Sequence, residues 1–584
     1  MDRNTILRWV VIASGVLLFY HFLWPKFSGQ SEGKHQPIPV EQYVDAPGFP
    51  PDVLDTPGPG RERSTTPPEG ELCTIKGTRF VAELSSRGAG VKHFRLQDRY
   101  ANTEAADMST TPDHERWRSL RTLFRAEGAN DQLRFDRFPW KVESLDGKAC
   151  RFTYTDETLV QITKTVTASA RPFELDVETT IQNLADAPKR HRFSIETFAF
   201  RRNKEIAGHL GSVSPFITEV ACATSKEVTR HNKDDFKEGW LNVPGTDRFA
   251  AVTDYYFGKA LVPVGGAAEC GILAEDWYAA GQARDHEEAG AVYHARLAYA
   301  AQELAPKAVA TYRQAAFFGP KEREVLTHAA GQAKGLGDLI NLGFFSPVAK
   351  VLVGILQFFH DHVTLQNWGL AIILMTVCLR TALFPLSVKQ IRTSFAMRRL
   401  KPEVDALNVK FADDPQAKNM AMMELWRKHG VNPLGGCLPQ MAQMPVWFAM
   451  YTTLQTAVEM YHTKFLWFQD LSAPDRFFVL PVILGALMIL QQRLVPMQGM
   501  DPMQQKMMTY LMPAVFMIMM LFLPAALGVY MMTNSVLGIV QQLVVERFAP
   551  KSGSAPPGEI GVKPLGKDKG QKPGSSLGKE KASV

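Results

Sequence analysis

Several polar residues of this chain lie within its long apolar segments, where polar side chains are rare. Arg380 is the most notable of them, because it carries a charge. Residues 367–390 form the run NWGLAIILMTVCLRTALFPLSVKQ, and crossing a bilayer takes about 20 mainly apolar residues. At about 1.5 Å of helix rise per residue, Arg380 lies roughly 18 Å from the tryptophan end of this run. An arginine at that depth costs about 2.5–3.5 kcal/mol or more, so it normally faces a bundle interior or a wet cavity.

Two interpretations of Arg380 follow from its position. Its side chain could extend toward Lys389, with Pro385 ending the helix early, so that the charge reaches the membrane surface. It could instead belong to a hydrated cavity, and other polar side chains would then lie at a similar depth. The polar side chains of the apolar segments that would share this cavity are Thr376, Gln440, Gln443, Asn534 and Gln541.

These side chains offer hydrogen bonds rather than acid or base groups. Thr376 lies one helical turn before Arg380, and Asn534 and Gln541 are seven residues apart on one face. In the topology predicted below, all of them fall in the cytoplasmic half of the membrane, which predicts a cavity open to the cytoplasm and closed outside. The alternative is ordinary interhelical hydrogen bonding, worth about 0.6 kcal/mol for each bond. An arginine without an acidic residue in the same spans favours the cavity.

Residues typical of enzymes and metal sites lack the spacing that such chemistry requires. The histidines and glutamates between His286 and His294 do not form the HExxH pattern of a zinc helix. Asp234 and Asp235 stand in a polar stretch, where a solvated surface is the simpler interpretation. We predict no catalytic residue, no metal site and no cofactor. A carbohydrate-processing site in this part of the chain stays open, without a specific motif to support it.

The six cysteines form no redox or zinc motif, because no CxxC spacing occurs. Cys378 and Cys437 lie in or beside apolar segments. The other four could pair in an oxidising compartment, and their spacing leaves the pairing open. These four are Cys73, Cys150, Cys222 and Cys270.

The first part of the chain is predicted to be an anchored soluble domain. Residues 1–24 form a signal-anchor helix rather than a cleaved signal peptide, because no small-residue cleavage site follows the apolar run. Residues 25–70, rich in proline, glycine, serine and charge, form a flexible linker. From 71 to 320, apolar and polar residues alternate with period two, which predicts a large antiparallel β-sandwich domain.

The remainder of the chain is predicted to be helical. Residues 321–364 form a connector whose helix at 344–360 has one apolar face and is predicted to lie on the membrane. Residues 365–548 form the main bundle, and 549–584 form a disordered basic tail. The predicted transmembrane helices of the bundle are 367–386, 438–458, 477–495, 507–522 and 524–545.

The distribution of charge orients these segments. With the anchor they make six spans, so an N-terminus in the cytoplasm also places the C-terminus there. The loop 387–437 is then cytoplasmic and carries nine Lys or Arg residues, as the positive-inside rule requires. This loop is predicted to be a helical hairpin that stands off the membrane, with its turn at 412–415.

Several stretches of the chain resemble the YidC/Oxa family of membrane protein insertases. They are Asn367-Trp-Gly369 with Arg380 and Pro385, VNPLGGCLPQMAQMPVWFAMY at 431–451, DPMQQKMM at 501–508 and, as a weaker match, TDYYFGKALVP at 253–263. The resemblance implies an α-helical polytopic membrane protein with a conserved five-helix core and a periplasmic all-β supersandwich domain of the Gram-negative type. It also implies an inner-membrane location and no enzyme activity.

The resemblance further implies a mechanism of insertion and folding of membrane proteins. A hydrophilic groove at Arg380 would admit the polar part of a nascent chain from the cytoplasm, and its apolar segment would leave along a greasy face. The implied groove residues are Arg380, Thr376, Gln440, Gln443, Asn534 and Gln541. The implied client-contact residues are Met444, Pro445, Phe448, Met512, Phe516 and Tyr530. Tyr530-Met531 departs from the paired aromatic residues common in the family.

The partners implied are nascent membrane proteins, the ribosome, the lipid bilayer and the Sec translocon, and no specific nucleic acid. Two other functions remain compatible with parts of the sequence. A secondary transporter would use the same cavity, but such proteins usually show internal repeats, and none is visible. A membrane-anchored periplasmic enzyme would need a catalytic constellation within 71–320, and no such constellation is found there.

Overall fold

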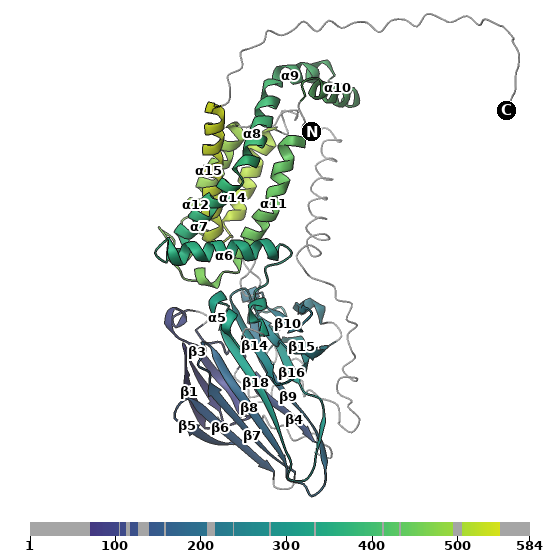
Figure 1. Cartoon of the computed structure of the whole chain (residues 1–584), viewed down its shortest axis with the longest axis vertical. Helices are drawn as coiled ribbons and strands as arrows, with labels where there is room; N and C mark the ends of the chain where they lie inside the picture. The colour runs from purple at the N-terminus through teal and green to yellow at the C-terminus, as the bar shows by residue number, and fades with distance from the viewer. Residues whose placement is uncertain are drawn as a thin grey trace, which may run out of the picture.

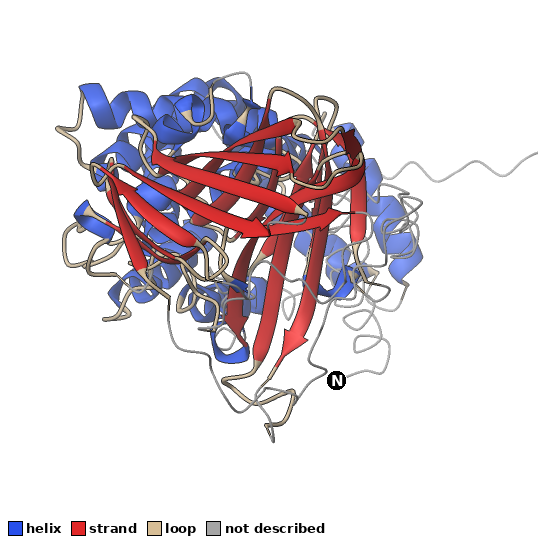
Figure 2. Ribbon diagram, turned by 90° about the horizontal axis from the view of Figure 1, so that it is seen from below, coloured by secondary structure: helices blue, strands red, loops and turns tan. Residues whose placement is uncertain are grey.

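The computed structural model describes residues 70–103, 106–112, 117–126, 139–156, 159–206, 217–236, 239–278, 282–331, 334–411, 414–430, 434–494 and 505–548. The predicted anchor at 1–24, the linker up to residue 69 and the tail at 549–584 lie outside these residues. The described part forms a β domain and a helical bundle stacked end to end (Figure 1). Seen from below, the strands lie nearer to the viewer and the helices behind them (Figure 2).

The β domain contains three antiparallel sheets among the described residues. The first has the order β1 (Leu72–Gly77), β2 (Phe80–Ser85), β3 (Gly90–Leu96). The second has the order β11 (Val228–His231), β10 (Glu219–Ala223), β13 (Phe249–Thr253), β14 (Phe257–Val264), β18 (Val309–Pro320), β8 (Glu174–Asn183), β7 (Val160–Ala168), β6 (Ala149–Asp156), β5 (Lys141–Leu145). The third has the order β12 (Leu241–Thr246), β15 (Ala268–Trp277), β16 (Gly290–Ala298), β9 (Lys189–Arg202), β17 (Gln302–Leu304), and β4 (Arg121–Ala126) also pairs with β9.

The sandwich forms because period-two alternation gives each strand a buried face. In β7, Val160, Ile162 and Val166 are at most 2% exposed, whereas Gln161, Thr163 and Thr165 are partly exposed. The predicted all-β sandwich is therefore confirmed. Two disulfides reinforce the domain, and they settle the pairing that the sequence leaves open: Cys73–Cys150 and Cys222–Cys270. The second disulfide joins β10 to β15 and so connects two different sheets.

The remaining elements are helical. Between the β domain and the bundle lie α5 (Arg323–His328), η7 (Leu336–Leu339) and α6 (Ser346–His362). The bundle and its hairpin comprise α7 (Trp368–Ala382), α8 (Phe384–Arg399), α9 (Lys401–Lys410), α10 (Pro415–Lys428), α11 (Leu434–Gln455), η8 (Val458–Met460), α12 (Val479–Leu494), η9 (Met507–Leu511), α14 (Met512–Met520) and α15 (Ala525–Phe548). The helix α6 lies across the end of the bundle that faces the β domain (Figure 1).

Prolines interrupt the stretch that leads from the predicted span at 367–386 through the first predicted helix of the hairpin, at 389–411. The axes of α7 and α8 differ by 65°, and the break at Leu383 comes just before Pro385. A second break at Leu400 precedes Pro402, so the predicted helix 389–411 is split between α8 and α9. Proline causes such breaks because it has no N–H to donate and because its ring clashes with the preceding turn.

The lengths of the described helices do not confirm six spans. Among the described residues, α15 alone is long and apolar enough to cross a membrane by itself, and the bent pair α7–α8 qualifies if it is counted as one span. The helices α12 and η9–α14 are apolar but shorter. The helical character of the 365–548 region is as predicted, and the number of crossings stays a prediction.

The β domain is docked onto the loop that follows α11. Arg323 Nη1 lies 2.7 Å from Glu459 Oε2, and the Arg323 backbone N–H donates to Glu459 Oε1 at 3.0 Å. Both side chains are 13% exposed. Tyr461 of the same loop packs against Tyr100, Tyr256 and Phe257 of the β domain. Charged and aromatic contacts therefore fix the β domain against the outer end of the bundle.

Candidate functional site: a polar cluster in the helical bundle

Arg380 lies in the last turn of α7 and points toward α15, which packs alongside α7. Its Nε donates to Asn534 Oδ1 at 2.6 Å, and its Nη2 donates to the Asn534 backbone oxygen at 2.9 Å. Gln541 Nε2 in turn donates to the Arg380 backbone oxygen at 3.1 Å. The three residues are all partly buried. Two helices that are about 150 residues apart in sequence are thus joined by polar groups within an apolar bundle.

The space for the Arg380 guanidinium is provided by a glycine. A Cβ added to Gly538 would lie 3.3 Å from Arg380 Nη2 and 3.3 Å from Gln491 Nε2, which is tighter than most contacts of a real Cβ. Gly538 therefore allows α15 to approach the guanidinium closely. Gln491 of α12 belongs to the same cluster, although sequence reasoning did not select it. The signal was available, because Gln491-Gln492 is a polar pair near the end of an apolar run, as Gln541-Gln542 is.

The two interpretations of Arg380 can now be compared. The helix does end before Pro385, as the first interpretation requires. However, the guanidinium is bound to Asn534 on a neighbouring helix and does not extend along its own helix toward Lys389. The hydrogen-bond partners of Arg380 within the described part of the chain are neutral amide groups, and no ion pair with a carboxylate is found there. The positive charge is therefore hydrogen-bonded without being neutralised.

The other predicted groove residues are placed less uniformly. Thr376 is 1% exposed, and its hydroxyl donates to the Ile372 backbone oxygen at 2.7 Å, so it is satisfied within its own helix. Gln443 is partly buried on α11. The side chain of Gln440 lies outside the described part of the structure. Gln542, the next residue after Gln541, is 3% exposed.

Some of the predicted client-contact residues are exposed, and others pack against residues of this protein. Met444 is 44% exposed and Met512 is 38% exposed, and Pro445 and Phe516 are partly exposed. Phe448 stacks on Phe345 at the start of α6, with ring centroids 5.9 Å apart. Tyr530 is only 3% exposed. Tyr530 lies inside the bundle because α15 is enclosed by its neighbours at this point, and contact of these six residues with clients stays a prediction.

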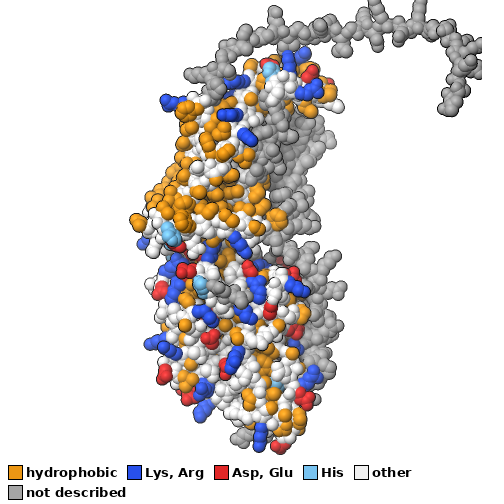
Figure 3. Space-filling model, in the orientation of Figure 1, with side chains coloured by type: hydrophobic (Ala, Val, Ile, Leu, Met, Phe, Trp, Pro, Cys, Tyr) orange, Lys and Arg blue, Asp and Glu red, His pale blue; other side chains and the backbone are white. Residues whose placement is uncertain are grey.

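The bundle presents a broad apolar surface between α6 and the hairpin, where charged side chains are sparse (Figure 3). Exposed apolar residues of three helices contribute to the surface of the bundle: Val482, Ile483 and Leu490 of α12, Val515 and Ile518 of α14, and Val536, Val540 and Leu543 of α15. An apolar surface of this extent would be unfavourable in water and is typical of contact with a membrane or an apolar partner.

The hairpin of α9 and α10 is held together by its own small core. Leu400, Val404 and Met422 are its buried members. On the outside, Val409 is 80% exposed and Met420 and Met423 are about two-thirds exposed. Figure 1 shows the hairpin at the end of the bundle opposite the β domain.

Two family profiles match adjacent parts of this chain, and curated relatives match nearly all of it. The family profile described as "60Kd inner membrane protein" matches residues 358–552, and the profile described as "YidC periplasmic domain" matches residues 72–355. A protein of Anaeromyxobacter dehalogenans named "Membrane protein insertase YidC" is 32% identical over 570 residues, which cover 94% of this chain and 98% of that relative. A protein of the same name from Geobacter sulfurreducens is 44% identical over 238 residues, or 41% of this chain and 43% of that relative.

Two solved structures illustrate which parts of this chain have structural counterparts. A crystal structure of an active YidC insertase with its first transmembrane domain resolved covers 82% of this chain and 94% of its own, at 18% identity and a TM-score of 0.34. A galactose mutarotase-like protein from Lactobacillus casei covers 42% of this chain and 100% of its own, at 11% identity and a TM-score of 0.31.

Proposed function

Because the chain belongs to the YidC family of membrane protein insertases, we propose that its Arg380 cluster forms the polar part of an insertion groove. Members of this family are inner-membrane proteins, and their substrates are membrane proteins in the course of insertion. In our proposal the groove opens to the cytoplasm and is closed on the periplasmic side. It receives the polar segment of a client while the apolar segment enters the lipid along the apolar surface of the bundle.

The observation that carries this proposal is that the described hydrogen-bond partners of Arg380 are neutral and leave its charge in place. Asn534 and Gln541 hold the residue through neutral hydrogen bonds, so the guanidinium stays positively charged and able to attract a carboxylate. Keeping a cation inside an apolar bundle is costly, and such residues usually mark a pathway for polar groups. A client with an acidic segment would gain a charge-assisted hydrogen bond here while that segment leaves water.

The remaining parts of the chain are assigned to successive stages of insertion. The hairpin of α9 and α10 makes the first contact with a client, since Met420 and Met423 offer flexible apolar side chains in the cytoplasm. Met444 and Met512 then contact the apolar segment of the client as it moves into lipid. The basic tail at 549–584 contributes to ribosome binding. The protein acts alone or with the Sec translocon, and it assists client folding as a chaperone.

The role of charge is tested by substitution of Arg380. Arg380→Lys should support insertion of clients with acidic translocated segments, whereas Arg380→Ala and Arg380→Glu should not. Clients with neutral segments should be much less affected by Arg380→Ala, because they do not need the attraction. Normal insertion of acidic clients by folded Arg380→Ala protein would overturn the proposal. Failure of Arg380→Lys alone would instead indicate that the planar, bidentate geometry of arginine is required.

Hydration of the groove is tested by labelling single cysteines in whole cells and inverted vesicles. In a background with Cys378 and Cys437 replaced by serine, Gln541→Cys should react with a charged maleimide added from the cytoplasmic side only. Ile518→Cys is the matched control, because Ile518 is 55% exposed on the apolar surface and should be shielded by lipid. Thr376→Cys should react more slowly than Gln541→Cys, since Thr376 is buried. An unreactive Gln541→Cys in folded protein would contradict a wet groove.

A further inference from the structure

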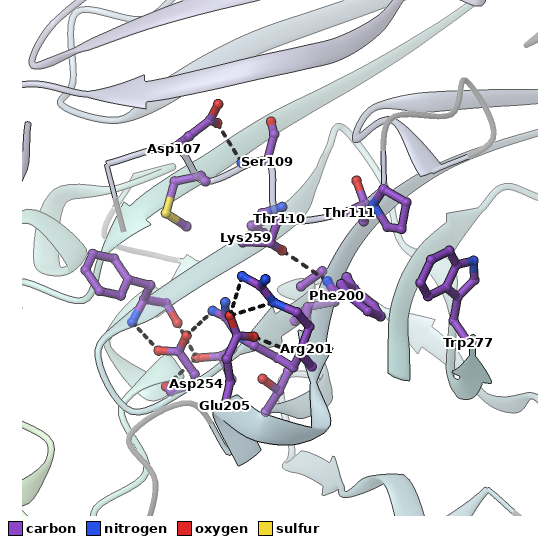
Figure 4. A pocket seen from close by; sticks show the side chains of 18 of the residues that line it. Asp107, Ser109, Thr110, Thr111, Phe200, Arg201, Glu205, Asp254, Lys259 and Trp277 are labelled. Carbon is purple, nitrogen blue, oxygen red and sulfur yellow. Dashed lines mark hydrogen bonds and ion pairs between the residues drawn. The ribbon is translucent and has the colours of Figure 1, made fainter. Parts of the chain in front are cut away.

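The periplasmic domain contains a cavity of about 590 Å³ that the insertion mechanism does not use (Figure 4). Its walls come from the end of β9, the start of β14, the segment 107–112 and Trp277 at the end of β15. The segment Thr253–Lys259, which belongs to the motif TDYYFGKALVP noted in the sequence, forms one side. The volume lies within the range of about 300–1,000 Å³ that is typical of small-molecule sites.

The arginines and carboxylates of the described wall all have polar partners. Arg201 Nη2 lies 2.6 Å from Asp254 Oδ2, and Arg202 binds both Glu205 and Glu288 at 3.1 Å. Asp107 Oδ2 lies 2.7 Å from Nδ1 of His93, a residue outside the wall. The described wall holds the carboxylates of Asp107, Glu205, Asp254 and Glu288 against Arg201, Arg202 and Lys259, so it has no positive excess that would attract an anion. The paired side chains nevertheless hold hydrogen-bond donors and acceptors in fixed positions, as Figure 4 shows for Arg201, Asp254 and Glu205.

Lys259 adds a donor to the same wall. It is 4% exposed, and its Nζ donates one hydrogen bond, to the Phe198 backbone oxygen at 2.6 Å. Burial lowers the pKa of Lys259 to about 7. An amino group has at least two N–H donors. Lys259 therefore keeps hydrogen-bonding capacity beside the cavity without imposing a full positive charge at neutral pH.

An aromatic wall and a row of hydroxyl groups complete the cavity. Trp277 is partly exposed, and it is held edge to face by Phe200 and Trp117, with ring centroids 5.2 and 6.2 Å away. Figure 4 shows Trp277, Thr110 and Thr111 among the side chains that line the cavity. A fixed indole face beside hydroxyl, carboxylate and guanidinium groups suits a ligand with an apolar face and a polar rim.

We propose that this cavity is a binding site for a neutral saccharide of one or two rings. The axial C–H groups of a sugar ring would pack on Trp277, and its hydroxyl groups would hydrogen-bond to the paired side chains and Lys259. We assign a neutral ligand because the two arginines and the four carboxylates of the described wall already have partners. An extended peptide fits less well, because strand addition needs free backbone groups along a strand edge. Beside the cavity, the Phe200 N–H donates to the Thr110 hydroxyl at 3.0 Å, and the Phe198 backbone oxygen accepts from Lys259 Nζ.

Binding should be measured on the full chain in lipid nanodiscs, because maltoside detergents carry a sugar headgroup of their own. The probes are glucose, galactose, N-acetylglucosamine, maltose and cellobiose, with saturation-transfer NMR as the readout. At least one of them should bind saturably. Trp277→Leu should weaken that binding about tenfold or more, since losing an aromatic contact and its buried area costs about 1.4 kcal/mol. Glu205→Gln, which keeps the shape of the wall, should also weaken it.

Two comparisons keep this test decisive. Trp426→Leu, the same substitution at a partly buried tryptophan of the cytoplasmic hairpin, should leave saccharide binding unchanged. Gluconate and glucosamine, the charged counterparts of glucose, should bind more weakly than glucose. The proposal fails if none of the five sugars binds to folded protein, or if binding survives Trp277→Leu and Glu205→Gln unchanged. It also fails if a blocked, neutral tripeptide binds at this cavity in place of the sugars.

Discussion

Arg380 donates one hydrogen bond to the side chain of Asn534 and a second to its backbone oxygen. The two bonds have different consequences for mutation. The side-chain bond can be removed or made ionic by changing Asn534, whereas the backbone bond remains as long as α7 and α15 stay packed. Asn534 is therefore the position at which the charge of the cluster can be altered while Arg380 itself is kept.

Asn534→Asp should inhibit insertion of clients with acidic segments to about the level of Arg380→Ala. The new carboxylate would lie 2.6 Å from Arg380 Nε and neutralise its charge. Asn534→Ala should have a smaller effect, because the guanidinium keeps its charge and its backbone partner. The measurement is insertion of matched clients that differ only in acidic residues. Equal activity of the Asp and Ala variants would show that the charge of the cluster does not matter.

Glu459→Ala should loosen the periplasmic domain from the bundle. It removes the partner of Arg323 from an ion pair in which both side chains are 13% exposed, and breaking such a pair costs about 3 kcal/mol. Hydrogen exchange should increase around 322–330 and 456–475. The matched control is Glu178→Ala, because the Arg313–Glu178 pair has the same 2.7 Å separation but is well exposed. That control should change stability by no more than about 0.5 kcal/mol. Similar effects of the two substitutions would argue against a structural role for the junction.

Removing the Cys222–Cys270 disulfide should destabilise the periplasmic domain without preventing insertion. The bond joins β10 and β15 of two different sheets across 48 residues of sequence, and closing a loop of this kind is worth about 2–4 kcal/mol. The double variant Cys222→Ala/Cys270→Ala should unfold at a lower urea concentration than the parent chain. Its insertion activity should stay near normal, because the Arg380 cluster lies in the bundle. A large loss of insertion in folded protein would show that the domain is directly involved.

The fold was predictable from the sequence where one periodicity dominates. Strand β7 shows this, since Val160, Ile162 and Val166 share the buried face and alternate with Gln161, Thr163 and Thr165, although Lys164 also lies on the buried face. The helix boundaries were less predictable at prolines, because hydropathy continues through Pro385 while the backbone bends by 65°. Disulfide pairing was not predictable at all, since it depends on which strands become neighbours in space.

The candidate site was predictable in part. Arg380, Asn534 and Gln541 stand out because polar groups are rare in apolar segments, and the structure brings these three together. Gly538 carries no such signal: its role depends on the approach of α15 to a side chain about 160 residues away in sequence. The enclosure of Tyr530 likewise depends on how neighbouring helices pack, which a single sequence does not specify.

Lys164 should make the stability of the periplasmic domain depend on pH. Its Nζ is fully buried and donates to the Ala89 backbone oxygen at 2.8 Å and to Thr122 Oγ1 at 3.1 Å. Burial lowers the pKa of Lys164 to about 7. Between pH 7 and 9 the folded state therefore binds fewer protons than the unfolded state, so the free energy of unfolding rises with pH.

The contribution of Lys164 to that slope is at most about 1.4 kcal/mol per pH unit. Lys164→Met should reduce the slope by up to this amount and should lower stability at pH 9, because buried acceptors lose their donor. Urea unfolding of the full chain at pH 7, 8 and 9 measures both effects. Lys259 and Lys321 also have lowered pKa values from burial, so part of the slope should remain in the variant. An unchanged slope would mean that Lys164 stays protonated throughout.

Gly538→Val should inhibit insertion even though it alters no charge. A Cβ at this position would already lie 3.3 Å from Arg380 Nη2, and the two further methyl groups of valine would displace the guanidinium from Asn534. Gly538→Ala should have an intermediate effect, since a single Cβ needs a shift of only a few tenths of an ångström. The matched control is Gly354→Val on α6, where a Cβ would meet no atom within 4 Å. Gly538→Val should change both the insertion of an acidic client and the maleimide labelling of Gln541→Cys. Gly354→Val should change neither. Normal insertion by Gly538→Val would show that the position of the Arg380 guanidinium is not critical.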